Sequence, residues 1–153
     1  MIVWDWLTAG EEFVMSGLWR HEAVHGLLAL GAAGVVWGKT KRIKLVLLAV
    51  AVAVFVDLDH LVDYLIFSGG NFRLSGFFEG EYFQATHRAI VPFHAWEWVG
   101  GLIFWGRRKK WQSVGWTMAV GLGVHLVFDA LTVGSLGFYS ILWRGLIRGF
   151  AGL

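Results

Sequence analysis

The stretch Val56-Asp57-Leu58-Asp59-His60-Leu61-Val62-Asp63 lies inside an apolar run that extends from Leu45 to Phe67. A run of this length is sufficient to cross the hydrocarbon core of a bilayer, which is ~30 Å thick and takes about 20 helical residues. Ionisable side chains at the centre of such a helix cost roughly 2.5–3.5 kcal/mol each on insertion scales. They therefore need a partner, a cavity or a metal ion, and by default they mark function. The stretch predicts both a membrane helix and a functional site.

The composition of the whole chain also favours a membrane protein. Of the 153 residues, 57% are hydrophobic and 16% are charged, whereas a soluble domain carries about 25% charged residues. The 21 glycines and the single proline suit close-packed membrane helices, and ten tryptophans suggest interfacial belts. The chain contains no cysteine, so disulfides and thiolate ligands are excluded, and any metal must be held by His and carboxylate side chains.

Four apolar segments predict an all-α fold, an integral membrane bundle of four transmembrane helices that forms a single domain over residues 1–153. The expected spans are residues 13–37 (or 17–37), 45–67, 92–105 and 114–133. The third is short for a bilayer, and Pro92 is tolerated in its first turn. Residues 1–12 and 138–150 predict amphipathic interfacial segments at the two ends. The glycine-containing segment that begins at residue 68 predicts a mobile outer loop.

Basic residues gather in two of the predicted connections, at 39–44 and 107–110. The positive-inside rule places both connections on the cytoplasmic face of the cell (inner) membrane. The termini and the connection between the second and third spans then face outward. We interpret these basic clusters as topology signals, and we expect no nucleic-acid partner.

With this topology, side chains that bind metals come from all four spans and fall at one depth, in the outer leaflet. They are His21, His25, Asp57, Asp59, His60, Asp63, His87, His94, Glu97, His125 and Asp129. His125 and Asp129 are four residues apart, on one helix face. Carboxylates and imidazoles on facing helices are how bundles build sites for one or two metal ions. A set without sulfur suits zinc, manganese, iron or magnesium, and we expect a divalent metal, zinc before the others, with one or two ions bound.

In these elements the chain resembles the membrane-bound metal-dependent hydrolases of the YdjM-like family. The matching elements, in the family's order, are His21-Glu-Ala-Val-His25, Asp57-Leu-Asp59-His60, His87-Arg88 followed by His94, and His125-Leu-Val-Phe-Asp129. The last is also similar to a pattern of all-helical zinc-dependent phospholipase C. Val56 stands where the family usually has proline. His87 and His94 are further apart than the family's pair, which raises Glu97 as a substitute. The resemblance implies phosphoester hydrolysis.

We therefore expect a hydrolase that cleaves a phosphoester of a membrane lipid or lipid-linked substrate at the extracytoplasmic side by metal-activated water. The expected metal ligands are His25, Asp57, Asp59, His60, His87, His94, His125 and Asp129. Arg88 would bind a phosphate oxygen, and Glu97 or Asp63 would act as the general base. Glu97 has a second interpretation, in which it holds a ligand histidine in its tautomer. His21 taken alone is more typical of a hydrogen-bonded packing residue.

Two other classes of function remain open. An ion or proton transporter also uses membrane acids and histidines. A pathway, however, needs polar groups on both sides of the midplane, and residues 46–55 and 117–122 are nearly featureless. The other class is a metal-binding or structural membrane protein without hydrolase activity. A purely structural subunit would hold no metal and would respond little to chelators.

Overall fold

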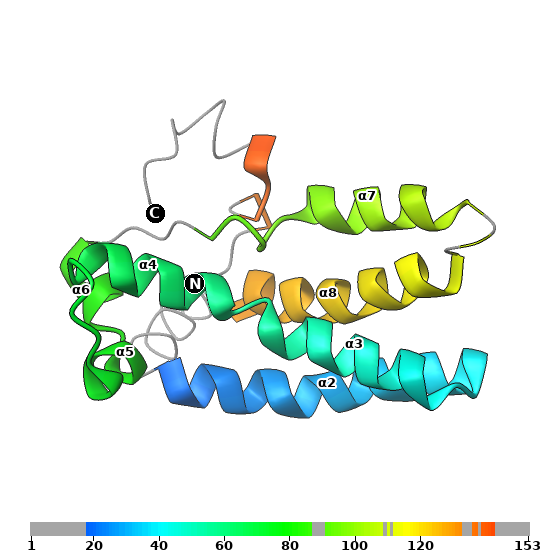
Figure 1. Ribbon diagram of the computed structural model, residues 1–153, viewed down its shortest axis with the longest axis horizontal. Coiled ribbons are helices and arrows are strands. Elements are labelled where there is room, and N and C mark those ends of the chain that lie inside the picture. Colours follow the sequence, from blue (N-terminus) through cyan, green and yellow to red (C-terminus); the bar gives the residue numbers. More distant parts are fainter. Residues whose placement is uncertain are drawn as a thin grey trace, which may run out of the picture.

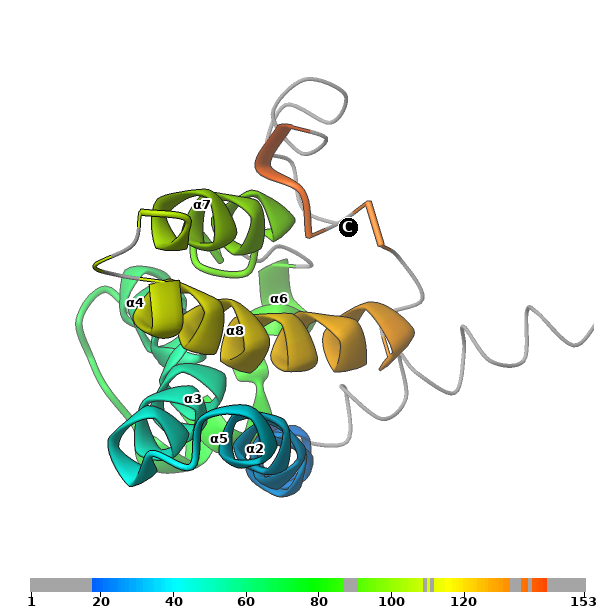
Figure 2. The same ribbon diagram turned by 90° about the vertical axis from the view of Figure 1, so that its right-hand side faces the viewer.

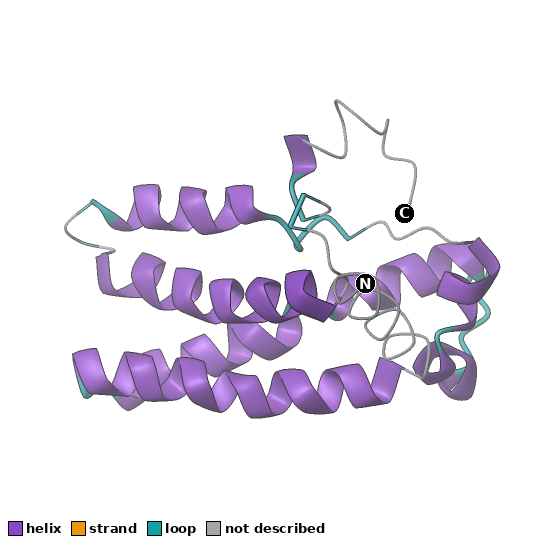
Figure 3. Ribbon diagram, turned by 180° about the vertical axis from the view of Figure 1, so that it is seen from behind, coloured by secondary structure: helices purple, strands orange, loops and turns teal. Residues whose placement is uncertain are grey.

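The structure is a computed structural model that describes residues 18–86, 91–108, 110, 112–132, 136–137 and 139–142. Every regular element in this part of the chain is a helix, and it contains no strand, so the predicted all-α class is confirmed (Figure 3). The main helices are α2 (Leu18–Thr40), α3 (Ile43–Phe55), α4 (Leu58–Phe67), α5 (Leu74–Glu79), α6 (Glu81–Thr86), α7 (Trp96–Gly106) and α8 (Gln112–Thr132).

Helix α8 is the central element of the bundle. It contacts α2 and α3 on one side and α7 on the other, and Figure 2 shows it crossing between them at an angle. Small side chains allow this close approach, since Ala32, Ala49 and Ala119 are all buried. A Cβ at Gly121 would lie 2.5 Å from the Ala49 carbonyl oxygen, so only glycine fits there. Helices α4, α5 and α6 gather at one end of this arrangement (Figure 1).

The second predicted span is two helices, α3 and α4, separated by a turn at Val56 and Asp57. The amide of Val56 still bonds to the Val52 carbonyl at 3.3 Å, and the His60 amide bonds to the Asp57 carbonyl at 3.0 Å. The chain therefore continues in nearly the same direction while the helical repeat is interrupted. The span expected over 45–67 is thus present but not as one regular helix, because it is interrupted at Val56 and Asp57.

The third predicted span is short, as expected, but it begins four residues later than predicted. Helix α7 begins at Trp96 and has 11 residues, a length of about 16 Å against the ~30 Å of a bilayer core. Pro92 was predicted in the first turn of this helix. It lies instead in a turn that precedes the helix. Two amides that follow Pro92 bond to other segments of the chain. The Phe93 N–H donates to Asp59 Oδ2, and the Trp96 N–H donates to the Tyr139 carbonyl.

Two helices of the described part are long and apolar enough to cross a membrane: Ile43–Phe67, counted through its turn, and Gln112–Thr132. The structure thus supports two candidate spans and not clearly four. Large apolar side chains are exposed on the described part of the chain, with Leu27 and Leu131 68% and 72% exposed, whereas ten polar or charged side chains are buried beside its hydrophobic core. Such large exposed apolar surfaces are typical of contact with a membrane or a partner. The predicted interfacial segments 1–12 and 138–150 lie outside the described residues, apart from 139–142.

The segment after α4, expected as a loop, is largely helical, and its predicted mobility stays a prediction. It contains α5 and α6, which pack around the buried ring of Tyr64. Phe77 and Tyr82 both meet this ring edge-on, with centroids 5.7 Å away. Arg73 and Glu81 join the ends of the two helices through an ion pair of 2.6 Å. These contacts between distant residues hold the segment, and glycine content did not reveal them.

Both basic connections lie at the same end of the bundle, opposite α4, α5 and α6 (Figure 1). The ammonium of Lys39, at the end of α2, lies 4.7 Å from the ring centroid of Trp116 near the start of α8. The predicted pairing of the two basic clusters on one side is therefore present in the structure.

Candidate metal centre

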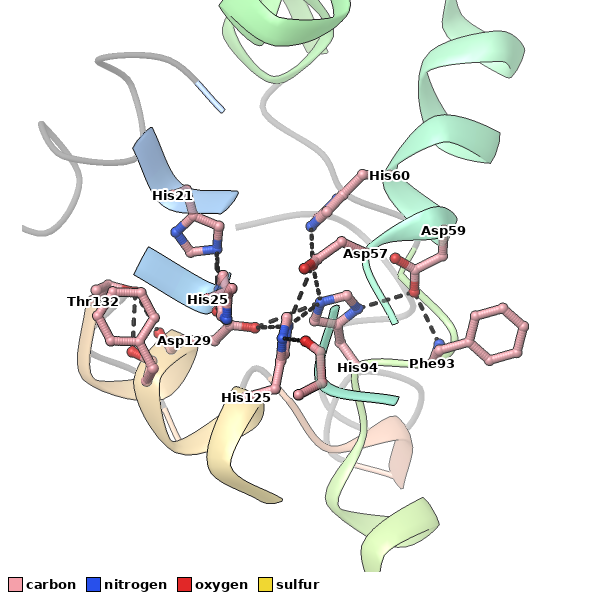
Figure 4. Close-up of polar contacts among 12 residues, drawn as sticks. His21, His25, Asp57, Asp59, His60, Phe93, His94, His125, Asp129 and Thr132 are labelled. Atoms are coloured by element: carbon pink, nitrogen blue, oxygen red, sulfur yellow. Dashed lines mark hydrogen bonds and ion pairs between the residues drawn. The ribbon is translucent and has the colours of Figure 1, made fainter. Parts of the chain in front are cut away.

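Seven buried ionisable side chains from distant parts of the chain converge beside α8 (Figure 4). They are His21 and His25 of α2, Asp57 of the turn, His60 of α4, His94 before α7, and His125 and Asp129 of α8. They form four overlapping groups of three, and within each group the possible ligand atoms all lie within 4.8 Å of one another. The predicted convergence of metal-binding side chains is thus present, and these groups can hold a metal ion.

His94 and His125 point the same ring atom toward one spot. His125 Nδ1 donates to the Ala53 carbonyl at 2.8 Å, and His94 Nδ1 donates to Asp59 Oδ2 at 3.0 Å. With Nδ1 protonated, Nε2 of each neutral ring carries a lone pair, and these two atoms are 3.0 Å apart. Facing lone pairs repel each other unless a cation or a proton lies between them. Two nitrogens bound to one tetrahedral zinc are about 3.3 Å apart, so the spacing fits a shared ion.

Two carboxylates complete this group of donors. Asp57 Oδ1 lies 3.0 Å from His94 Nε2 and 3.3 Å from His125 Nε2. Asp129 Oδ2 lies 3.0 Å from His125 Nε2 and 3.5 Å from His94 Nε2. Two imidazole nitrogens and two carboxylate oxygens form a sulfur-free set that suits zinc and other divalent ions. His60 stands next to this set, with Nε2 3.5 Å from Asp57 Oδ1.

A second pair of histidines uses the other oxygen of Asp129. Nε2 of His21 and Nε2 of His25 are 2.8 Å apart and lie 3.1 Å and 2.8 Å from Asp129 Oδ1. The ring of His25 stacks on that of His125 with centroids 3.8 Å apart, which joins the two halves of the centre. Asp129 therefore sits between two histidine pairs with one oxygen directed to each. Asp129 is thus a member of two of the groups that could each hold a metal ion, one with His21 and His25 and one with His94 and His125.

Asp59 and Asp63 occupy positions behind the centre. Asp59 is fully buried, and its Oδ2 accepts hydrogen bonds from both His94 Nδ1 and the Phe93 amide. It belongs to none of the four groups and contacts a candidate ligand histidine from behind, as an orienting carboxylate does, while its expected role as a direct ligand stays a prediction. Asp63, expected as a base, is also outside the groups. It lies near Tyr82, where burial and then the charge of Asp63 raise the pKa of the phenol above its ordinary value.

Glu97 is used by the C-terminal segment. Its carboxylate accepts hydrogen bonds from the Ser140 hydroxyl at 2.5 Å and from the amides of Ile141 and Leu142 at 3.1 and 3.2 Å. It is in none of the four groups. Glu97 therefore anchors the C-terminal segment in this structure, whereas its expected roles as a base or a ligand substitute stay predictions, and the carboxylate that contacts a candidate ligand histidine is Asp59. His87 and Arg88, an expected ligand and an expected phosphate-binding residue, lie outside the described residues.

Two residues of α2 are closer to the centre than the sequence suggested. His21 is a full member of the group with His25 and Asp129. Its spacing of four residues from His25, the same as that of His125 and Asp129, is the signal that could have identified it. Glu22 is partly buried, and its charge interacts with that of Asp57. Two neighbouring carboxyl groups at the centre increase its need for a cation or a shared proton.

Comparison of the chain with protein-family models, with curated proteins and with solved structures gives no match. The candidate centre therefore rests on its own geometry, and membership of the YdjM-like family stays a prediction.

Proposed function

We propose that the protein is a membrane-embedded hydrolase that uses one or two divalent metal ions, zinc before manganese, iron or magnesium. The proposed substrate is a phosphoester of a membrane lipid or lipid-linked compound. The observation that carries the proposal is the position of Asp129, whose two oxygens each face a pair of histidine Nε2 atoms. Hydrolysis of phosphoesters is a reaction for which paired metal ions are suited. The order of the motifs at His25, Asp57, His94 and His125 supports the same class.

The proposed residue roles follow from the contacts. His94, His125, Asp57 and Asp129 would hold one ion, and His21, His25 and Asp129 would hold a second. Asp59 and the Ala53 carbonyl orient His94 and His125 by accepting from Nδ1. A metal ion, when bound, lowers the pKa of a coordinated water to about 7 and offsets the charge of a phosphate. Glu22, whose charge interacts with that of Asp57, would add negative charge beside the bound ion.

We further propose that the protein lies in the cell (inner) membrane with the metal centre toward the extracytoplasmic side. Both basic connections would then be cytoplasmic, as the positive-inside rule requires. His125 is about 20 Å along α8 from its first residue, at 1.5 Å per residue. The centre would thus lie in the outer half of the bilayer, where it can meet a lipid headgroup without extraction of the lipid.

A hydrolysis assay tests this proposal. The protein is purified in detergent, reconstituted with Zn²⁺ or Mn²⁺, and supplied with phospholipids and polyprenyl phosphates. We expect release of phosphate or a headgroup by the wild type, and a loss of more than about 100-fold in His125→Ala, as removal of a metal ligand implies. Thr117→Val is the matched control, because Thr117 is buried on the same helix and belongs to none of the four groups. Bound metal without turnover of any phosphoester would contradict the hydrolase proposal.

The second candidate function is proton or ion transport. It is favoured by the continuous series of contacts from His21 through Asp129 and His94 to His60. On α8 the buried polar side chains reach no nearer to the basic end than His125, however, and the described buried residues from there toward that end are apolar apart from Thr117. Uptake of protons or metal ions by sealed proteoliposomes, with no hydrolysis, would favour this alternative.

A further inference from the structure

An open apolar groove with a volume of about 450 Å³ lies on the outside of the bundle between α3, α7 and α8. This volume is within the roughly 300–1,000 Å³ of ordinary ligand sites. All of its lining residues are apolar. The only lining side chain with a polar atom is Trp98, and its Nε1–H already donates to the Pro92 carbonyl at 2.8 Å. The groove therefore suits a hydrocarbon and not a polar ligand.

One end of the groove adjoins the metal centre. Val56 lines it and is followed by Asp57, and Phe93 lines it and is followed by His94. The amide of Phe93 also donates to Asp59, the residue that orients His94. On two of its walls, the lining residue is thus the direct neighbour in sequence of a proposed metal ligand.

All three walls leave the centre in the same direction. On α3 the lining extends from Val56 back to Ala51, and on α8 it extends from Leu122 back to Met118. On the third side it continues from Phe93 to Leu102 of α7. Each course leads toward the basic end of the bundle (Figure 1). Because α3 and α8 belong to the two candidate spans, the groove would extend from the headgroup depth toward the middle of the membrane, as the chain of an outer-leaflet lipid does.

We propose that this groove holds one hydrocarbon chain of the lipid whose phosphate reaches the metal centre. The inference rests on the proposed function and narrows its substrate class, since it requires a long aliphatic chain next to the phosphoester. The groove positions the lipid by its chain, and the metal centre receives the phosphate. A helix from a second copy of the protein and unspecific bulk lipid are the other occupants that the following experiment separates from this one.

Photo-crosslinking tests the proposal without relying on activity. The metal-loaded protein in lipid nanodiscs is exposed to a phosphatidic acid that carries a diazirine in the middle of one acyl chain, and the labelled residues are mapped by mass spectrometry. We expect label at Ala51, Trp98 and Met118 that unlabelled long-chain phosphatidic acid displaces. Ala51→Trp fills the groove, and excluding a few methylenes should lower the apparent affinity about tenfold or more. Met118→Trp is a second variant that fills the groove from α8.

Leu47→Trp is the matched control, because Leu47 is on the same helix, is 60% exposed and does not line the groove. Metal content equal to that of the wild type shows that each variant is folded. Label spread evenly over the exposed apolar residues, or unchanged in both groove variants, would overturn the proposal in favour of bulk lipid. Protein–protein crosslinks at the groove would overturn it in favour of a second copy. Failure of the proposed function would look different from failure of the groove proposal. The protein would then bind no metal, or would hydrolyse no phosphoester whatever the length of its hydrocarbon chain.

Discussion

Asp59 Oδ2 lies 3.0 Å from His94 Nδ1, and both side chains are buried. This contact fixes the tautomer of His94 and directs its Nε2 toward His125 and Asp57. A carboxylate in this position also makes the imidazole a more basic ligand. Asp59 would thus act on a bound metal through His94, although it contributes no atom to the four groups of possible ligands.

Asp59→Asn is therefore expected to weaken metal binding without abolishing it. Loss of an orienting partner of this kind typically costs about 10–100-fold in metal affinity, whereas His94→Ala removes a donor and should cost more. Competition with a chromophoric chelator measures both affinities. Equal affinity of Asp59→Asn and the wild type would show that the contact is only structural.

Removal of the metal should destabilise the protein. Without a cation, Asp57, Asp129 and Glu22 are left close together in a buried site, and each buried charge needs compensation. Metal at 100 times its dissociation constant contributes about 2.7 kcal/mol by mass action alone. We expect a lower thermal unfolding midpoint after treatment with EDTA and recovery after addition of Zn²⁺. A midpoint that EDTA does not change would indicate a network held by protons alone.

Glu97→Gln should loosen the C-terminal segment and leave the metal centre intact. The charged carboxylate accepts from Ser140 and from two backbone amides, and hydrogen bonds to charged groups contribute about 1.5–3 kcal/mol each. Faster hydrogen exchange at residues 140–142, with unchanged metal content, is the expected result. A large loss of metal in this variant would instead place Glu97 at the centre, as the sequence first suggested.

The proposed orientation can be checked with single cysteines, because the chain has none of its own. Ser75 lies at the α4–α6 end and Gln112 at the basic end, and both are exposed. A maleimide that cannot cross the inner membrane is applied to cells whose inner membrane is intact. It should label Ser75→Cys and not Gln112→Cys. Both should react after lysis, which serves as the control. The opposite labelling pattern would place the metal centre on the cytoplasmic side.

The sequence predicted the helical class and the convergence at the centre because both depend on local signals. The four-residue spacing of His125 and Asp129 places them on one face of α8 wherever the helix packs. The turn at Val56 and Asp57 could not be predicted in this way, since no glycine or proline marks it. Because of that turn, the two aspartates reach different atoms. Asp57 contacts Nε2 of both His94 and His125, whereas Asp59 contacts Nδ1 of His94.

The remaining differences come from contacts between distant residues. Pro92 matched the first position of a helix, but the following amides bond to Asp59 and Tyr139, which delays α7 to Trp96. The role of Glu97 depends on residues 140–142, more than 40 positions away, and no spacing rule within one helix reports such a pairing. Predictions from periodicity are reliable within one helix and fail where another segment supplies the hydrogen-bond partner.

The most direct test of the central claim is elemental analysis of the purified protein, expressed as metal ions per chain. The account predicts one or two zinc or similar divalent ions in the wild type and in Thr117→Val, and less than half of that content in Asp129→Ala, which removes the oxygens that both histidine pairs contact. A wild type that retains no divalent metal after purification without chelators, and takes up none when it is supplied, would contradict it.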